Sequence, residues 1–207
     1  VGAERGILIR SGEAIQTFKD VKVMILDKTG TITRGEPKLT DVVPADGVSE
    51  TELLELATAV ENASEHPIAR AIVYGARERG IKPGNVVDFR STGARGVSGR
   101  VGESTVLIGN RLLLEEQGVN GLEALDKSLS DLEDQGRTAV IVARDGKAYG
   151  IVAVADTLKD ESVAAIRAMH EQGLYVVMIT GDNERAANAV AREVGIDEVR
   201  AGVLPEG

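Results

Sequence analysis

The pattern at the two ends of the chain constrains its fold more than any other feature. Residues 21–26 form a short apolar run without polar alternation, which is typical of a strand buried on both faces. Near the other end, the sequence predicts a helix at 161–172, a strand at 175–180 and a helix at 184–194. Because strands alternate with helices there, we expect a parallel α/β sheet with right-handed crossovers, which the first strand joins.

The middle of the chain has a different pattern, in which two helices come first and hairpins follow. Ser49 and Glu52 form a capping box before one helix, and Pro67 opens a second helix that Gly80 closes. The remaining predicted elements are glycine-punctuated strands over 91–110, a helix over 122–135, and two strands over 138–156 around Asp145-Gly146. These features predict an α+β domain inserted into the α/β domain that the two ends form.

The expected domain boundaries follow from this change of pattern. They are a leader over 1–16, a discontinuous α/β domain over 17–35 and 147–207, and an inserted domain over 36–146. We expect the two linkers near 33–37 and 145–150, with Gly35 and Gly146 as hinge positions.

Composition restricts the classes of function that the chain can have. Its 207 residues carry 33 acidic and 24 basic side chains, a formal net charge of −9, and only 2% of them are aromatic. An acidic chain with so few aromatic residues is not expected to bind nucleic acid. The absence of cysteine excludes disulfides and thiolate metal sites. No apolar run approaches the roughly 20 residues that a membrane span needs.

Polar clusters follow two predicted strands of the parallel sheet. Asp27 comes directly after the first strand, and Thr180, Gly181 and Asp182 follow the strand near the other end. Ligands of open parallel sheets lie beyond the carboxyl ends of the strands, so these clusters converge if the strands are neighbours. An aspartate there can be a nucleophile that forms an acyl-phosphate, or it can hold Mg²⁺. The alternative is an ordinary turn or helix cap.

Five segments, in order along the chain, resemble signatures of heavy-metal-transporting P-type ATPases. The segment DKTGT at 27–31 matches the phosphorylation signature, and TGD at 180–182 matches a second signature. The segment SEHPIARAI at 64–72 is similar to the Ser-Glu-His-Pro motif of the heavy-metal class, and DTLK at 156–159 and the final LPEG resemble its hinge-side segments. The resemblance covers essentially the whole chain. It implies a phosphorylation domain of the haloacid-dehalogenase fold, incomplete at its C-terminal end, with an inserted nucleotide-binding domain.

The resemblance implies roles for residues of the phosphorylation domain. Asp27 is expected to attack the γ-phosphate of Mg²⁺-bound ATP, and Thr29 is expected to help bind Mg²⁺ through its backbone carbonyl. Asp27 and Thr29 are thus the expected metal ligands. The other implied residues of this site are Lys28, which favours the ionised carboxylate, and Thr180, Gly181 and Asp182, which line the phosphate site.

The resemblance also implies a nucleotide cleft in the inserted domain. Its expected residues are Glu61, His66, Gly93, Gly96, Gly109 and Asn110. Glu61 and His66 are expected to face the adenine, and a histidine ring stacked on a base contributes roughly 1–3 kcal/mol. The family has Gly-x-Gly followed by an aliphatic residue, whereas this chain has GARGV, with Ala94 in place of the first glycine and Gly93 one position early.

Thr29 separates two kinds of enzyme with this fold. In related phosphatases, the second residue after the nucleophile is usually an aspartate that serves as general acid and base. Because Thr29 lacks a carboxylate, water beside the acyl-phosphate is poorly activated, and the phosphoenzyme is expected to live as long as a pump requires. The alternatives to a pump are a soluble haloacid-dehalogenase-type phosphatase with a cap domain and a nucleotide-binding regulatory module without chemistry.

The predicted function is therefore that of the ATP-binding and phosphorylation region of a metal-exporting ATPase, with copper preferred over zinc, cadmium or cobalt. The implied partners are ATP and the transmembrane and actuator domains of the same protein, at the cytoplasmic face of a cell membrane. The family continues beyond LPEG with a lysine and a Gly-Asp-Gly segment, so we expect a chain ending at Gly207 to be an excised fragment that binds nucleotide but turns over ATP poorly.

Overall fold

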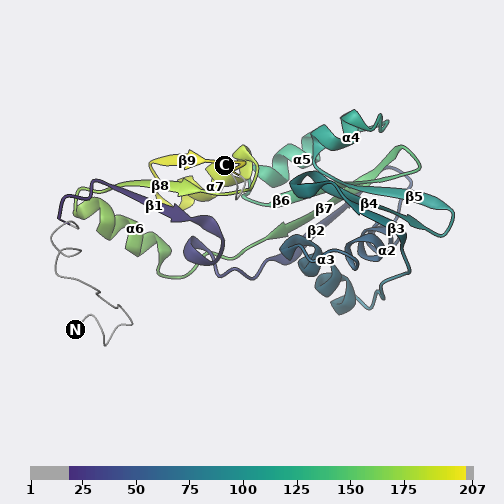
Figure 1. The fold of residues 1–207 in the computed structure, drawn as a ribbon, viewed down its shortest axis with the longest axis horizontal. Helices are drawn as coiled ribbons and strands as arrows, with labels where there is room; N and C mark the ends of the chain where they lie inside the picture. Colours follow the sequence, from purple (N-terminus) through teal and green to yellow (C-terminus); the bar gives the residue numbers. More distant parts are fainter. Residues whose placement is uncertain (1–18, 204–207) are drawn as a thin grey trace.

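The computed structural model describes residues 19–203 and contains two lobes, each built on its own sheet (Figure 1). The parallel lobe holds strands β1, β8 and β9 with helices α6 and α7, and the antiparallel lobe holds strands β2 to β7 with helices α2 to α5. The chain crosses between the lobes before β2 and again after β7. The expected leader over 1–16 and the LPEG segment lie outside the described residues.

The parallel lobe confirms the α/β pattern predicted for the two ends of the chain. Strands β1 (Val23–Asp27), β8 (Tyr175–Ile179) and β9 (Glu198–Arg200) pair in that order and run parallel. Helix α6 (Ser162–Glu171) precedes β8, and helix α7 (Glu184–Val194) connects β8 to β9. Apolar residues of both helices pack with the sheet in one buried cluster.

The expectation that the first strand is buried on both faces is wrong for the described structure. Val23 is 48% exposed and Ile25 is 60% exposed, whereas Leu26 packs against the core of the lobe. The reason is that β1 is an edge strand whose other face meets no element of residues 19–203. A run of apolar residues could not reveal this, because it shows which side chains favour burial and not what covers them.

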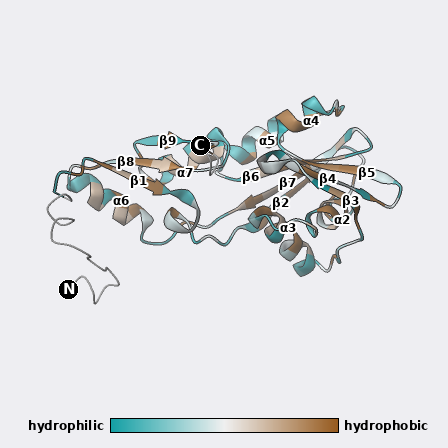
Figure 2. Cartoon of the chain, in the orientation of Figure 1, coloured by the Kyte–Doolittle hydropathy of each residue, from teal (hydrophilic) through white to brown (hydrophobic). Residues whose placement is uncertain are grey.

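The antiparallel lobe has one six-stranded sheet in which every pair of neighbouring strands is antiparallel. Its order is β2-β7-β6-β5-β4-β3. The strands are β2 (Lys38–Pro44), β3 (Val87–Ser91), β4 (Gly96–Val101), β5 (Ser104–Gly109), β6 (Thr138–Arg144) and β7 (Lys147–Ala155). Strands β1, β7 and β8 are among the most hydrophobic segments of the chain, whereas the short strand β9 is hydrophilic (Figure 2).

The hairpin predicted around Asp145-Gly146 is present, but the expected boundary at 146/147 is wrong. Asp145 and Gly146 have φ angles of 49° and 76°, which suit the tight turn that joins β6 to β7. Strand β7 also pairs with β2, so its residues belong to the antiparallel sheet and Gly146 is a turn residue far from any linker. Two strands that share a ladder cannot be assigned to different domains. The second crossing between the lobes therefore follows Ala155.

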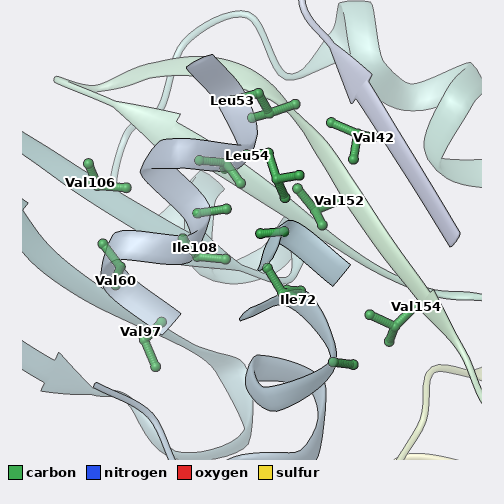
Figure 3. Close-up of a cluster of buried hydrophobic side chains, with 14 residues drawn as sticks. Val42, Leu53, Leu54, Val60, Ile72, Val97, Val106, Ile108, Val152 and Val154 are labelled. Atoms are coloured by element: carbon green, nitrogen blue, oxygen red, sulfur yellow. The ribbon is translucent and has the colours of Figure 1, made fainter. Parts of the chain in front are cut away.

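Helices cover both faces of the antiparallel sheet. Helices α2 (Glu50–Glu61) and α3 (Pro67–Glu78) pack on one face, where Leu53, Leu54 and Ile72 meet strand residues in a buried cluster (Figure 3). The Ser49 hydroxyl accepts the N–H of Glu52 at 3.2 Å, as the capping pattern predicted. On the other face, the region predicted as one helix over 122–135 is a short 3₁₀ turn, Glu123–Leu125, followed by α5 (Asp126–Glu133). Helix α4 (Arg111–Glu116) packs beside them.

Candidate functional site

The loop after β1 is an irregular turn that places the Asp27 carboxylate at an open edge of the parallel sheet. The turn covers Lys28–Ile32, and Gly30 within it has a φ of 77°, which a glycine adopts readily. Asp27 is exposed, and within residues 19–203 no hydrogen bond or ion pair holds its carboxylate. An ionised carboxylate that no neighbour engages is available to a ligand or as a nucleophile.

The exit from this loop is fixed by Asp156, a residue to which the sequence pattern gave no chemical role. The hydroxyl of Thr33, which is fully buried, donates to Asp156 Oδ2 at 2.5 Å and lies 3.0 Å from the Lys28 carbonyl oxygen. The backbone N–H groups of Gly35 and Glu36 donate to the two oxygens of the same carboxylate at 3.0 and 3.1 Å. One carboxylate therefore holds both crossings between the lobes together.

Two more side chains from the second crossing hold the loop by its backbone. The ammonium group of Lys159 donates to the Gly30 carbonyl oxygen at 2.6 Å, and the Ser162 hydroxyl donates to the Ile32 carbonyl oxygen at 2.6 Å. These contacts join residues about 130 positions apart, so no local pattern could predict them. Two signals were available in the sequence. One is a polar residue directly after a buried strand, as Asp156 follows β7, and the other is the resemblance of DTLK at 156–159 to a hinge-side segment.

The two strand-end clusters predicted to converge do so, because β1 and β8 are neighbours in the sheet. Lys28 is buried and forms an ion pair with Asp182. The hydroxyl of Thr180, also buried, donates to Asp182 Oδ2 at 3.0 Å, and Gly181 lies between them in the chain. Lys28 directly follows Asp27 in the chain, and its charge is matched by Asp182, which lies in the loop after the neighbouring strand β8.

The oxygen groups of the loop fit Mg²⁺ only together with a phosphate ligand. Within residues 19–203, no three acidic, histidine or cysteine side chains gather as a ready metal cage. Mg²⁺ is commonly bound by one or two carboxylates together with substrate phosphates and water. The Asp27 carboxylate and the Thr29 carbonyl oxygen match that kind of donor set.

His66 caps helix α3, and its ring is held in one tautomer. The backbone N–H of Ile68 donates to His66 Nδ1 at 3.2 Å, so the proton of the neutral ring lies on Nε2. Partial burial of the ring lowers the pKa of His66, and the negative charge of Asp182 opposes this in part. The antiparallel lobe supplies this ring at the start of helix α3.

Glu61 ends helix α2 and is buried, with 6% of its surface exposed. Within residues 19–203 no hydrogen bond or ion pair compensates its carboxyl group, and burial raises its pKa from 4.5 to about 7. Near neutral pH this carboxyl group can therefore either donate or accept a hydrogen bond. Only four residues separate Glu61 from His66, so both flank the turn between α2 and α3.

The burial of Glu61 predicts an unusual pH dependence of stability. The stabilising neutral form is fully present below pH 4.5 and is lost as the pH rises through about 7, so the free energy of unfolding should fall across that window. The substitution Glu61→Gln is expected to remove this fall and to stabilise the protein above pH 8 by on the order of 3 kcal/mol. Urea unfolding from pH 5 to pH 8 measures both effects. Glu55→Gln, on the exposed side of the same helix, controls for the lost charge, and equal pH profiles for the two variants would contradict the prediction.

The glycines predicted for the nucleotide cleft have a structural reason in the hairpin of β4 and β5. Gly96 and Gly109 are direct partners, and a methyl group on Gly96 would lie 2.2 Å from the Ile108 carbonyl oxygen and 2.8 Å from the Gly109 Cα atom. Asn110 Oδ1 accepts the N–H of Leu113 at 2.9 Å and so caps helix α4. Gly93 has a φ of 60° in a short turn with open space around it.

The predicted residues therefore form two groups. Asp27, Lys28, Thr180 and Asp182 lie together at the ends of β1 and β8, and Gly96, Gly109 and Asn110 lie together at the ends of β4 and β5. The structure gives no contact between the second group and the first. Two shallow surface depressions, lined mainly by α2 and residues 79–84, contain none of the predicted residues.

The sequence of this chain is similar to those of known proteins. The chain belongs to the haloacid dehalogenase-like hydrolases, whose family pattern matches residues 21–207. A copper-transporting P-type ATPase of Rhizobium leguminosarum bv. viciae is 47% identical over 206 residues, which cover 100% of this chain and 24% of that protein. A silver-exporting P-type ATPase of Salmonella typhimurium is 40% identical over 209 residues, which cover 100% of this chain and 25% of that protein.

Solved structures of metal-transporting P-type ATPases also resemble this chain. A zinc-transporting PIB-type ATPase in its E2.Pi state is 38% identical, with a TM-score of 0.70, and the match covers 99% of this chain and 33% of that one. The resemblance to heavy-metal-transporting P-type ATPases is confirmed, and the chain spans about a quarter of the length of the curated relatives it matches. Of the helices in residues 19–203, none is long and apolar enough to cross a membrane.

Proposed function

We propose that this chain is the ATP-binding and phosphorylation region of a heavy-metal-exporting P-type ATPase. The observation that carries the proposal is the meeting of both lobes at Asp182. Lys28, which follows Asp27 in the chain, forms an ion pair with Asp182, and the hydroxyl of Thr138 in the other lobe donates to the same carboxylate at 3.1 Å. A nucleotide whose base lies on His66 would direct its phosphates toward Asp27.

In the proposed reaction, a carboxylate oxygen of Asp27 attacks the γ-phosphorus of ATP. A bond forms between that oxygen and phosphorus, the bond from phosphorus to the β–γ bridging oxygen breaks, and ADP leaves with the electron pair. Mg²⁺ bound with the phosphates offsets their negative charge. The chain itself fixes the geometry of the loop, because Lys159 binds the Gly30 carbonyl oxygen and Asp156 binds the backbone where the loop ends.

The phosphatase alternative has weaker support. The loop carries Thr29 where a phosphatase would have an aspartate, and the nearby carboxylate of Asp182 is engaged by Lys28 and Thr180. A threonine hydroxyl is a poor general base, and the Asp182 carboxylate is held by Lys28 and Thr180, so hydrolysis of the aspartyl-phosphate should be slow. Slow hydrolysis suits coupling to transport, and it agrees with the expectation that the isolated chain turns over ATP poorly.

Labelling with γ-³²P-ATP and Mg²⁺ tests the proposed function. We expect an acid-stable label that hydroxylamine removes and that ADP discharges, because an acyl-phosphate is sensitive to both. Hydrolysis of p-nitrophenyl phosphate without labelling by ATP would instead support a phosphatase. ATP binding with neither activity would support a regulatory module.

The proposal extends to a longer protein, because this chain matches only about a quarter of the length of its curated relatives. The partners would be the transmembrane and actuator domains of the same polypeptide, with this region at the cytoplasmic face of the membrane. The relatives named above are described as transporting copper, silver and zinc, and copper is the proposed cargo because it is named for the relative with 47% identity.

A further inference from the structure

The two lobes touch where the start of β6 and helix α5 meet the TGD loop and helix α7. Thr138, the first residue of β6, donates its hydroxyl to Asp182 Oδ1 at 3.1 Å. Beside this contact, Arg185 of α7 bonds to Ser130 and lies 3.6 Å from Asp134, both in the segment that leads to Thr138. The antiparallel lobe therefore contacts the TGD loop through a defined hydrogen bond.

The two oxygens of the Asp182 carboxylate have different partners. Oδ2 meets the ammonium group of Lys28 and the hydroxyl of Thr180, which both belong to the parallel lobe. Oδ1 meets Thr138, which belongs to the other lobe. Because a carboxylate rotates as a rigid group, a bond that fixes one oxygen also fixes the other.

Lys28 depends on this carboxylate. Its side chain is 8% exposed, and Asp182 is its ion-pair partner within residues 19–203. A buried ammonium group that loses its partner must move toward water, since an unpaired buried charge is costly. A rotation of Asp182 would therefore displace the ammonium group of Lys28, the residue that follows Asp27 in the loop.

We propose that Thr138 is a positioning residue for phosphoryl transfer. Its hydroxyl holds Asp182, and Asp182 in turn holds the ammonium group of Lys28 in the loop that begins after Asp27. This arrangement therefore depends on where the antiparallel lobe lies. This inference rests on the proposed function, and it assigns Thr138 no contact with the nucleotide.

Two substitutions separate the hydroxyl from the shape of the side chain. Thr138→Val keeps the branched shape that suits a strand and removes the hydrogen bond, whereas Thr138→Ser keeps the hydrogen bond and removes a methyl group. Thr40→Val is the matched control, because the Thr40 hydroxyl donates to a backbone oxygen of its own lobe, Ala153, at 3.2 Å.

The first measurement is the rate of aspartyl-phosphate formation at saturating ATP, with the ATP dissociation constant measured separately. Thr138→Val is expected to slow the reaction about 10-fold or more, the scale of one hydrogen bond to a charged group, and to leave the dissociation constant unchanged within about twofold. Thr138→Ser and Thr40→Val should both react at the rate of the unsubstituted chain. Equal rates for Thr138→Val and the unsubstituted chain would overturn the inference.

The second measurement needs no ATP, and it separates this inference from the proposed function. The ¹⁵N–¹H signal of the Lys28 ammonium group, assigned with Lys28→Arg, should be visible because the ion pair slows proton exchange. We expect Thr138→Val to broaden or shift it and Thr138→Ser to preserve it. If the unsubstituted chain takes no label from ATP but the Lys28 signal responds in this way, the proposed function fails while the link from Thr138 to Lys28 stands. An unchanged signal in Thr138→Val overturns the link.

Discussion

Replacement of Asp27 by asparagine is expected to reduce labelling by γ-³²P-ATP by about 1000-fold or more, while ATP still binds with similar affinity. The amide oxygen of asparagine is a poor nucleophile and cannot form a stable acyl-phosphate, so the reaction loses its acceptor. The loop itself should keep its shape, because Asp156, Lys159 and Ser162 hold its backbone without help from the Asp27 side chain. Acid-quenched labelling and calorimetric titration with a non-hydrolysable ATP analogue measure the two quantities.

Asp160→Asn is the matched control for this substitution. Asp160 is an exposed carboxylate on the second crossing between the lobes, and its partner is Arg34 at the surface. The substitution Asp160→Asn removes one negative charge near the loop. Labelling should change less than about twofold, since a surface ion pair contributes little to stability. Label that persists in Asp27→Asn would show that another residue accepts the phosphate.

Substitution of Gly96 by alanine is expected to destabilise the protein by on the order of 4 kcal/mol. The backbone of Gly96 has a φ of 155° and a ψ of −174°, a region that only glycine adopts readily. The added methyl group would also meet the Ile108 carbonyl oxygen at 2.2 Å, so two backbone strands would have to separate. Backbone strain and overpacking each cost about 1–3 kcal/mol. The midpoint and slope of urea unfolding measure the sum.

Gly93→Ala provides the comparison within the same glycine-rich segment. Gly93 has a φ of 60°, but no atom would lie within 4 Å of an added methyl group. Only the left-handed backbone is then penalised, at about 1 kcal/mol. A loss for Gly93→Ala as large as that for Gly96→Ala would mean that packing between β4 and β5 does not explain the requirement for glycine.

Much of the fold could be predicted because local sequence patterns determine it. The parallel arrangement followed from strands alternating with helices near the C-terminus, and the hairpin of β6 and β7 followed from Asp145-Gly146. That hairpin already places β7 in the sheet of β6, so the boundary expected at 146/147 conflicted with the predicted hairpin. The local pattern could not reveal the pairing of β7 with β2, a strand more than 100 residues away in sequence.

The candidate site was predictable only in part, for a similar reason. Asp27 and the TGD segment follow strands, and adjacent parallel strands bring their carboxyl ends together. Thr138 and Lys159 do not follow such a rule, because a single hydroxyl or ammonium group gains its role from a partner far away in sequence. For Gly96 and Gly109 the resemblance indicated a ligand cleft, whereas the geometry shows a close approach of two strands, which can support such a cleft.

The pairing of β2 with β7 has a consequence for the architecture of the chain. Lys38, the first residue of β2, lies opposite Ala155, the last residue of β7, so the antiparallel lobe begins and ends at one ladder position. Directly opposite residues of antiparallel strands have Cα atoms about 4.5–5.5 Å apart. The antiparallel lobe thus enters and leaves the chain at neighbouring points. A short linker of a few residues could therefore replace the whole lobe and still connect the two parts of the parallel lobe.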